Sequence, residues 1–419
     1  MPAPARISLF VGKGGVGKST LAAATAVRDA CAGQRVLLVS TDQAHSVGDV
    51  LGVPVTPTGH HDPVRICADL EIGRVDLGGG FLDALALDTL ALLEVRWRAV
   101  VDILDRRFPE SELSSIAPEE LSALPGIQEV LGLHEVSELA GCGRWDRIVV
   151  DCASTADALR MLTLPATFGL YLERAWPRHR RLSMVAEDTR SAALVEMLER
   201  IDASVERLTA LLTDDGVVGA HLVLTAERVV AAEAVRTLGA LALMGVRVEE
   251  VLVNQVLWQD DSYEYRSLPE HPAFDWYAER IHEQSAVLND LEATIGDVAL
   301  VLAPHLSGEP IGPKALAELL DSARRRGGSA PPGPLHPVVD LESGSGLGSV
   351  YRMRIELPQL DPGALTLGRA DDDLIIGIGA LRRRVRLASV LRRCSVLDAH
   401  LRGDELTVRF RPNPEVWPV

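Results

Sequence analysis

The chain has 419 residues, more than the ~250 to 300 that a single hydrophobic core usually supports, so we expect two domains. A formal net charge of −17 disfavours a nucleic-acid partner and anionic membranes, because such surfaces attract basic patches. The first residues lack the pattern of a secretion signal and no apolar run is long enough for a membrane span, so we expect a soluble, cytoplasmic protein without stable membrane insertion.

A P-loop follows the first predicted strand, residues 7–11, and leads into a predicted helix over 18–31. Eight consecutive residues match G-x-x-x-x-G-K-S/T: Gly12, Lys13, Gly14, Gly15, Val16, Gly17, Lys18 and Ser19. Glycines let backbone N–H groups turn toward a polyphosphate, while Lys18 supplies a charge and Ser19 an oxygen ligand for Mg²⁺. These residues and the adjoining Thr20 are therefore predicted to bind a nucleotide.

Asp42 follows the second predicted strand, residues 35–39, within the segment 40–46. At this end of a parallel sheet a carboxylate can contact Mg²⁺, or orient or deprotonate the water that attacks a γ-phosphate. A helix cap is the alternative for a lone aspartate, and the neighbouring P-loop favours the catalytic interpretation.

Asp151 closes another apolar strand, residues 147–150, and is predicted to be the Walker B carboxylate near Mg²⁺, with a helix N-cap as the alternative. Further buried strands are predicted at 221–224, 248–253 and 298–302. The alternation of strands and helices predicts an α/β P-loop NTPase fold with a doubly wound, mostly parallel sheet.

Two long segments, 83–139 and 163–212, have helical apolar spacing and few turn signals, so we expect a helical subdomain there. In the second segment apolar residues recur every three or four positions: Leu182, Val185, Leu194, Leu198, Ile201, Val205, Leu208 and Leu211. Such a face either packs on its own domain or forms a groove for a hydrophobic client, and the spacing leaves both open.

The last third of the chain has a different pattern. We expect an ATPase domain over 1–325, a Gly/Pro-rich linker over 326–337 and an all-β sandwich over 338–419. Residues 351–357 and 406–410 alternate strictly between apolar and polar side chains, as in strands with one buried face, and shorter runs follow at 374–378, 381–387 and 395–401. The arginine triplet at 324–326 is expected to be a solvated helix end, with a binding patch as the alternative.

The five cysteines are widely spaced and include no C-x-x-C pair: Cys31, Cys67, Cys142, Cys152 and Cys394. This spacing predicts buried or free thiols and disfavours a disulfide scaffold or a structural zinc site.

Together these motifs resemble the ArsA/guided-entry family, which contains arsenite-pump ATPases and ATPases that target tail-anchored proteins. The resemblance covers residues 5–325 and rests on Lys13 inside a deviant Walker A P-loop, the switch I segment 40–46, and a switch II made of Asp151, Ala153, Thr155, Leu159 and Arg160. It implies that Lys13 reaches the nucleotide of a second subunit as a catalytic residue, alongside Lys18 and Asp42. It also implies that Asn254 reads adenine and that the loop containing Pro304 closes over the base. Without the resemblance, a turn residue is the expected role of Asn254.

The C-terminal module resembles the α-crystallin-like (small heat-shock protein) domain that some bacterial ArsA-like ATPases carry. That resemblance implies partner binding through strand edges. A dimerising or merely stabilising sandwich is the alternative.

The chain also departs from the family pattern. Gln43 replaces a switch I proline, and Ser154, Ala156 and Asp157 replace the proline, glycine and histidine of switch II. Losing the glycine stiffens a loop that has to move, so we expect weak coupling between hydrolysis and subunit closure. The family's dimer-floor C-x-x-C and a clear set of three arsenite cysteines are missing, and one ATPase unit is present instead of two fused halves.

The leading hypothesis is a cytoplasmic ATPase with ATP and Mg²⁺ as cofactors, working as a homodimer or a heterodimer with a related chain. It would handle a protein client, with membrane proteins among the candidates. The main alternative is a slow or inactive nucleotide-binding adaptor. An arsenite-efflux motor is disfavoured, because a soft metalloid needs thiolate ligands and the cysteines are scattered.

Overall fold

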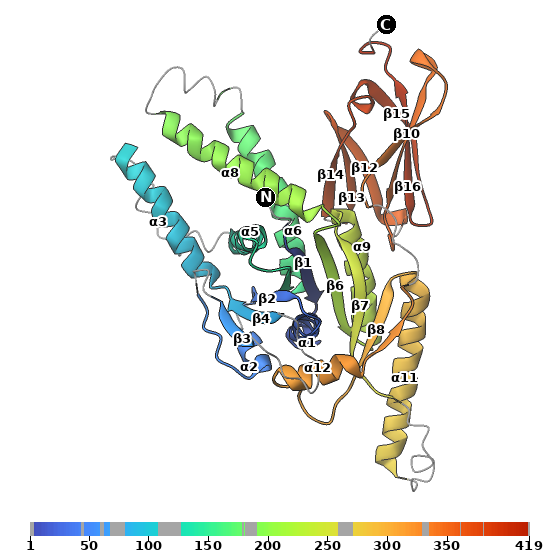
Figure 1. The fold of residues 1–419 in the computed structure, drawn as a ribbon. Coiled ribbons are helices and arrows are strands. Elements are labelled where there is room, and N and C mark those ends of the chain that lie inside the picture. Colours follow the sequence, from blue (N-terminus) through green and yellow to red (C-terminus); the bar gives the residue numbers. More distant parts are fainter. Residues whose placement is uncertain are drawn as a thin grey trace. The chain divides into compact units, whose positions relative to one another are not determined.

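The structure is a computed structural model that describes residues 4–42, 46–58, 63–67, 80–107, 127–177, 180, 191–258, 271–328, 335–360, 362–379 and 381–417. In these residues strands and helices alternate up to residue 326, and strands dominate after that (Figure 1).

Among the described residues, nine strands form one large sheet in the order β3-β4-β2-β5-β1-β6-β7-β8-β9. Their bounds are β1 (Arg6–Gly12), β2 (Arg35–Ser40), β3 (Val64–Cys67), β4 (Phe81–Ala86), β5 (Arg147–Asp151), β6 (Val218–Thr225), β7 (Arg247–Val256), β8 (Ala299–Pro304) and β9 (Arg324–Arg326). Strand β1 pairs in parallel with β5 and β6, and β2 with β4 and β5, while β3 is antiparallel to β4. The predicted mostly parallel α/β sheet is confirmed, and its central strands are continuous apolar runs because helices cover both faces.

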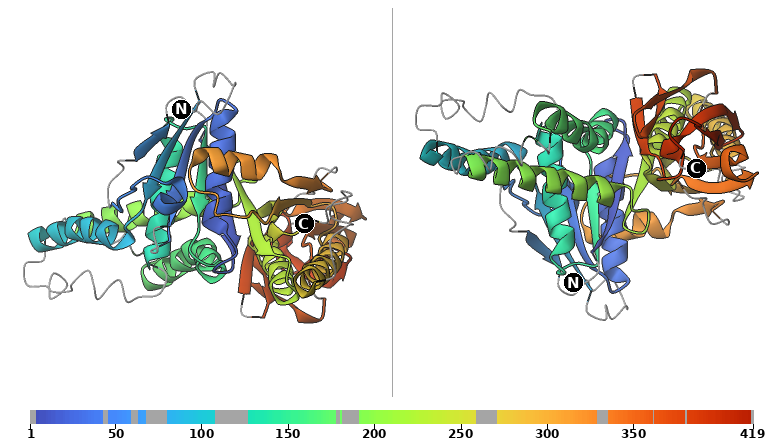
Figure 2. Two further views of the ribbon diagram at one scale, coloured as in Figure 1. Left: turned by 90° about the horizontal axis from the view of Figure 1, so that it is seen from below. Right: turned by 90° about the horizontal axis from the view of Figure 1, so that it is seen from above.

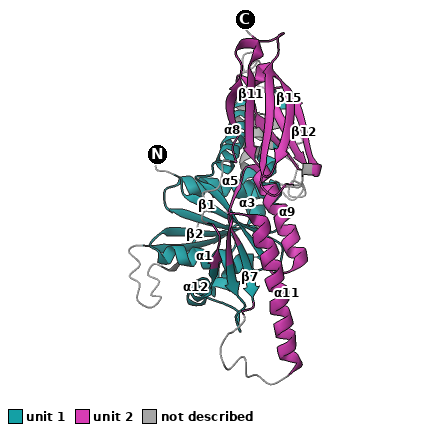
Figure 3. Ribbon diagram, turned by 90° about the vertical axis from the view of Figure 1, so that its right-hand side faces the viewer, with its two compact units in different colours: residues 1–224, 252–256, 302–324 teal, residues 225–251, 257–301, 325–419 magenta. Residues whose placement is uncertain are grey.

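The chain divides into two compact units, residues 1–224, 252–256 and 302–324, and residues 225–251, 257–301 and 325–419 (Figure 3). Every residue predicted to bind nucleotide or Mg²⁺ lies in the first unit. The predicted domain limits at 325 and 337 stay a prediction.

In the first unit, helix α1 (Lys18–Cys31) packs against β1, β2, β4 and β5 and against helix α12 (Pro313–Asp321). Helices α5 (Ile127–Gly141) and α6 (Thr155–Ala175) contact β5 and β1 from the other face of the sheet (Figures 1 and 2). Right-handed crossovers place these helices on opposite faces, because the chain moves along the sheet in opposite directions after β1 and after β5.

Helices α3 (Thr89–Arg107), α5, α6 and α8 (Ser191–Leu212) pack on one another: α3 on α5, α5 on α6 and α8, and α6 on α8. On α8, the side chains of Val195, Leu198, Val205 and Leu208 are buried, so its apolar stripe packs within its own unit. Leu182 and Val185 of the predicted stripe lie outside the described residues.

The expectation that the first helical segment starts at residue 83 is wrong, because residues 81–86 are strand β4. Short apolar runs do not separate a buried strand from a helix by spacing alone. Asp83 is fully buried in this strand, where its carboxylate accepts a hydrogen bond from Trp145 Nε1 (3.0 Å) and pairs with Arg144 (3.2 Å). These two partners allow a charged side chain in the sheet.

The second unit contains α9 (Arg228–Met244), α11 (Pro272–Ile295) and the C-terminal strands. The arginine triplet is not a helix end: it forms edge strand β9, where Arg325 pairs with Glu250 and Arg326 with Glu292 (3.3 Å). The expected linker therefore follows a strand of the sheet directly.

The C-terminal strands form two antiparallel sheets, in the orders β10-β11-β16-β15 and β12-β13-β14. They are β10 (Val338–Ser343), β11 (Val350–Glu356), β12 (Leu365–Ala370), β13 (Asp373–Ile378), β14 (Leu381–Arg386), β15 (Cys394–Arg402) and β16 (Glu405–Pro412). The alternation predicted for β11 and β16 is confirmed, since Met353 and Ile355 lie opposite Val408 and Leu406, all of them buried. Strands β10 and β12 were not predicted.

The sandwich core includes one residue from outside the sandwich, Leu243 of α9. Beside it, the Arg383 guanidinium of β14 donates to the carbonyl oxygens of Ala242 (3.5 Å) and Leu335 (3.3 Å). Burial lowers the pKa of Arg383 to about 10. Within the second unit the sandwich is therefore packed on α9, which supports a stabilising role for it.

Candidate nucleotide site

The P-loop joins the end of β1 to the start of α1. Gly17 is the N-cap of α1 and has a left-handed backbone (φ 88°, ψ 31°) that favours glycine. No side chain caps α1 and its first turn holds no acidic residue, so the N–H groups at this helix terminus are available to an anion.

Gly12 is required by close packing. A Cβ atom at Gly12 would lie 2.2 Å from the carbonyl oxygen of Val223 in the neighbouring strand β6. Gly14 and Gly15 have open space instead, and Gly15 also has a positive φ of 82°. The loop is therefore tight where it leaves the sheet and open where a phosphate would bind.

Ser19, Asp151 and Ser46 form a hydrogen-bonded chain beside the P-loop. The Ser19 hydroxyl donates to Asp151 Oδ2 (2.6 Å), and the Ser46 hydroxyl donates to Ser19 Oγ (2.8 Å). Asp151 Oδ1 is buried and has no hydrogen-bond partner among the described residues. The structure thus brings the predicted Walker B carboxylate to the predicted P-loop ligand.

Burial raises the pKa of the Asp151 carboxyl to about 6. The hydrogen bond from Ser19 and the charge of Lys18 oppose this rise, and the charge of Asp42 adds to it. The two carboxyl groups therefore lie near enough for the charge of Asp42 to affect the pKa of Asp151. Lys18 itself is buried, while Lys13 is exposed on the loop.

The donor set fits a hard cation such as Mg²⁺, which prefers carboxylate and hydroxyl oxygens and commonly binds one or two carboxylates together with substrate phosphates. A buried carboxylate oxygen without a partner is the structural sign of such a site. The residues that would hold the ion are Ser19, Asp42 and Asp151.

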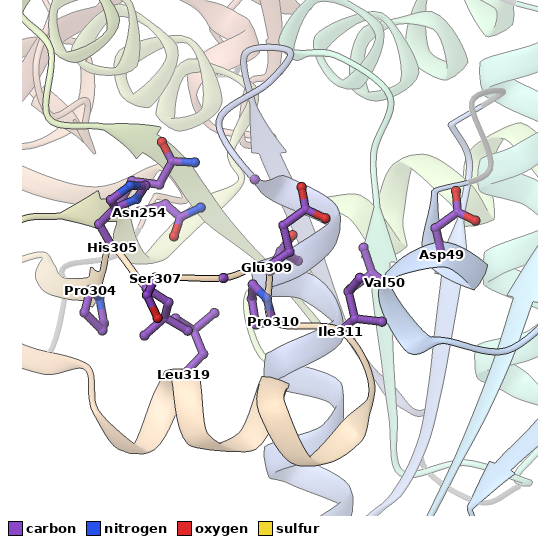
Figure 4. Close-up of a pocket in the computed structure, with 15 residues that line it drawn as sticks. Asp49, Val50, Asn254, Pro304, His305, Ser307, Glu309, Pro310, Ile311 and Leu319 are labelled. Atoms are coloured by element: carbon purple, nitrogen blue, oxygen red, sulfur yellow. The ribbon is translucent and has the colours of Figure 1, made fainter.

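A pocket of about 550 Å³ opens next to the P-loop and is lined by residues from α1, α2 (Val47–Leu51), the end of β7 and the loop after β8. Asn254 and Pro304 line it (Figure 4). Gly17 and Thr20 line it as well. The segment from His305 to Ile311 forms one side of the pocket. Its size suits a nucleoside.

Comparison with known families identifies the family to which the chain belongs. The profile of the ArsA-type family described as "Anion-transporting ATPase" matches residues 5–323, and that of an "HSP20-like domain found in ArsA" matches residues 348–410. The chain belongs to the ArsA ATPase family. The predicted resemblance is confirmed for both parts of the chain.

Relatives of this ArsA-type chain match it at several levels of identity. "Protein Rv2184c" of Mycobacterium tuberculosis is 81% identical over 418 residues, covering 100% of this chain and 98% of the relative. "Putative arsenical pump-driving ATPase 1" of Aquifex aeolicus is 25% identical and covers 96% of this chain and 99% of its own length. "ATPase get3" of Schizosaccharomyces japonicus is 24% identical over 75% of this chain and 91% of its own.

The segment that aligns with the family's switch II has a defined structure in this ArsA-family chain. Ser154 is the N-cap of α6: its hydroxyl accepts a bond from the Asp157 amide (3.3 Å) and donates to Asp157 Oδ2 (2.6 Å). Asp157 also pairs with Arg160, which reaches Glu129 on α5 (3.3 Å). We call the four residues Ser154, Asp157, Arg160 and Glu129 the switch II clasp.

Sequence reasoning missed two features of the site. Ser46 starts α2 without capping it and uses its hydroxyl on Ser19, and its place at the end of switch I was the available signal. The backbone N–H of Thr41 donates to the backbone carbonyl oxygen of Asp151 (3.0 Å), a contact without a sequence signature. Gln43 lies outside the described residues.

Cys31, Cys142, Cys152 and Cys394 are free thiols, and burial raises the pKa of Cys152 to about 12. Within the described part of the chain, no group of three or more His, Cys, Asp or Glu side chains is arranged to hold a metal ion. No helix in that part is long and apolar enough to cross a membrane.

Proposed function

We propose that this chain is a Mg²⁺-dependent ATP hydrolase whose nucleotide state controls the pairing of two subunits and the handling of a protein client. The observation that carries the proposal is the Ser19–Asp151 contact beside the uncapped start of α1, with one oxygen of Asp151 lacking a partner. An ATP phosphate chain at the P-loop would meet backbone N–H groups, the charge of Lys18 and a cation site at once.

Each residue has a role in this proposal. Lys18 offsets the charge of the β- and γ-phosphates, and Ser19, Asp42 and Asp151 hold Mg²⁺. When bound, Mg²⁺ would supply positive charge that offsets the charge of the phosphates. Asp42 orients the attacking water, and the pocket that contains Asn254 and Pro304 takes the base.

Lys13 is the residue through which a second subunit would take part in the site. This lysine is exposed on the P-loop, so it can reach a phosphate that belongs to a facing subunit. ATP would then favour the closed pair, because the contact forms only in that state. The test compares Lys13→Ala with Lys18→Ala: we expect both to lose turnover, and only Lys18→Ala to lose ATP binding to the isolated subunit. A Lys13→Ala protein with full turnover and normal nucleotide-dependent pairing contradicts the cross-subunit role.

The client would bind the helical subdomain. The large side chains of Phe168 and Tyr171 on α6 and of Trp176, its C-cap, are 47%, 65% and 44% exposed, although α6 packs on α5 and α8 elsewhere. Exposed aromatic side chains on a helix support binding of an apolar segment. Crosslinking from position 171 to a captured chain in an Asp42→Asn trap with ATP tests this, and capture that does not change with Tyr171→Ser speaks against it.

The second candidate is a slow or inactive nucleotide-binding adaptor, which the switch II clasp favours. A capping interaction at the start of α6 and the ion pair from Arg160 to Glu129 of α5 oppose movement of the loop that senses the γ-phosphate. Steady-state phosphate release decides between the two. Magnesium-dependent release supports the hydrolase, and no release above background, alone or with a related chain, supports the adaptor.

A further inference from the structure

Asn254 touches both halves of the nucleotide site. It is buried at the end of β7 and lines the pocket with Pro304 (Figure 4). Its side-chain Nδ2 also donates a hydrogen bond to the carbonyl oxygen of Val16 in the P-loop (3.1 Å). One amide therefore links the base pocket to the loop that would hold the phosphates.

The contact is built closely into the loop. A Cβ atom at Gly17 would lie 2.1 Å from Asn254 Nδ2, so the amide fits only because this position is glycine. The orientation of the amide is fixed as well, because the flipped form would place Oδ1 against the Val16 carbonyl oxygen, and two acceptors repel.

The P-loop needs such a partner. Its backbone N–H groups can face a polyphosphate only if the carbonyl groups between them point away from it. Val16 is buried, and a buried carbonyl requires a donor. Asn254 supplies that donor with one of its two N–H groups, and its other N–H and its Oδ1 remain for the pocket.

We infer that Asn254 is a positioning residue of the phosphate cradle: by holding the Val16 carbonyl away from the cradle, it determines how well the P-loop binds a polyphosphate, with or without a base. The inference rests on the proposed function, since it concerns the same nucleotide site.

The experiment uses the full chain and two ligands, Mg²⁺·ATP and inorganic tripolyphosphate with Mg²⁺, with affinities measured by calorimetry. The Asn254→Leu variant keeps the shape of the side chain, adds no charge and removes the donor. Pro304→Ala, a change in the base pocket, is the matched control. We expect Asn254→Leu to weaken both ligands, tripolyphosphate by a factor on the order of ten or more and ATP by at least as much, and Pro304→Ala to weaken ATP only.

A second variant, Asn254→Ala, tests the same loss without an introduced side chain, and thermal melting checks that each protein is folded. Methyl NMR of Val16 in the nucleotide-free protein gives a readout independent of binding: its signals should change in both Asn254 variants and stay unchanged in Pro304→Ala.

Weakened ATP binding with unchanged tripolyphosphate binding would overturn the inference, because Asn254 would then act on the base alone. A wild-type chain that binds neither ligand would overturn the proposed function, and the inference with it.

Discussion

Replacing Asp151 with asparagine should stabilise the protein when both nucleotide and metal are absent. Asp151 is fully buried, and only one of its carboxylate oxygens has a hydrogen-bond partner, the Ser19 hydroxyl. Asparagine keeps an acceptor for Ser19 and removes the buried charge. A residue that is present for ligand binding would thus lower the stability of the protein without ligand.

The magnitude follows from the pKa of Asp151, which burial raises from 3.8 to about 6. The folded protein holds this proton more tightly than the unfolded chain, so stability falls as the pH rises from about 3.8 through about 6. At about 1.4 kcal/mol per pKa unit, the ionised carboxylate costs roughly 3 kcal/mol above that range. The advantage of Asp151→Asn should be about 3 kcal/mol at pH 8 and roughly half of that at pH 5.

The assay is urea unfolding of wild type and Asp151→Asn in EDTA at pH 8 and pH 5, followed by a signal from the ATPase part of the chain. Adding Mg²⁺ and ADP should stabilise the wild type and have much less effect on the variant. A variant that is no more stable than wild type at pH 8, or an advantage that does not shrink at pH 5, would refute the reasoning.

Three further changes have defined outcomes. Gly12→Ala places a Cβ atom 2.2 Å from the Val223 carbonyl, so nucleotide binding should be lost, and calorimetry showing normal affinity would contradict the packing. Asp157→Ala opens the switch II clasp and should raise ATP turnover by up to about fivefold, because exposed ion pairs contribute up to about 1 kcal/mol. An unchanged turnover rate would show that the clasp does not restrain the movement of switch II. Arg383→Ala should lower the unfolding free energy by about 1 to 3 kcal/mol in denaturant titrations, whereas the exposed Arg386→Ala should not, and equal effects would argue against the buried contact with α9.

The sequence signals that predict the nucleotide site are local. Glycines at fixed spacing, a lysine and a hydroxyl mark a P-loop wherever a strand precedes them, and the structure places Ser19 on Asp151 as that pattern implies. The alternation in β11 and β16 was equally clear, since each strand has one buried face.

Features that depend on contacts between residues far apart in the sequence were harder to predict from the sequence. Strand β4 was expected to be part of a helical segment, because the spacing of a short apolar run does not separate a strand from a helix. The contacts that accommodate its charged residue, Asp83, come from Trp145 and Arg144, which are distant in sequence. The contact between Asn254 and Val16 spans 238 residues and leaves no local pattern. The strand pattern of the C-terminal sandwich could not separate partner binding from a stabilising role. The packing of its core on Leu243 involves helix α9, which precedes the sandwich by about 100 residues and is not part of the strand pattern.

The central claim is that this site hydrolyses ATP with Mg²⁺, and Asp42→Asn tests it most directly when binding and turnover are measured on the same preparation. We predict magnesium-dependent phosphate release by the wild type and a fall of about 100-fold or more in the variant when both are measured at saturating ATP and Mg²⁺, because Asp42 acts on the attacking water. Wild-type protein that binds ATP without releasing phosphate, or an Asp42→Asn variant with full turnover, would contradict the account.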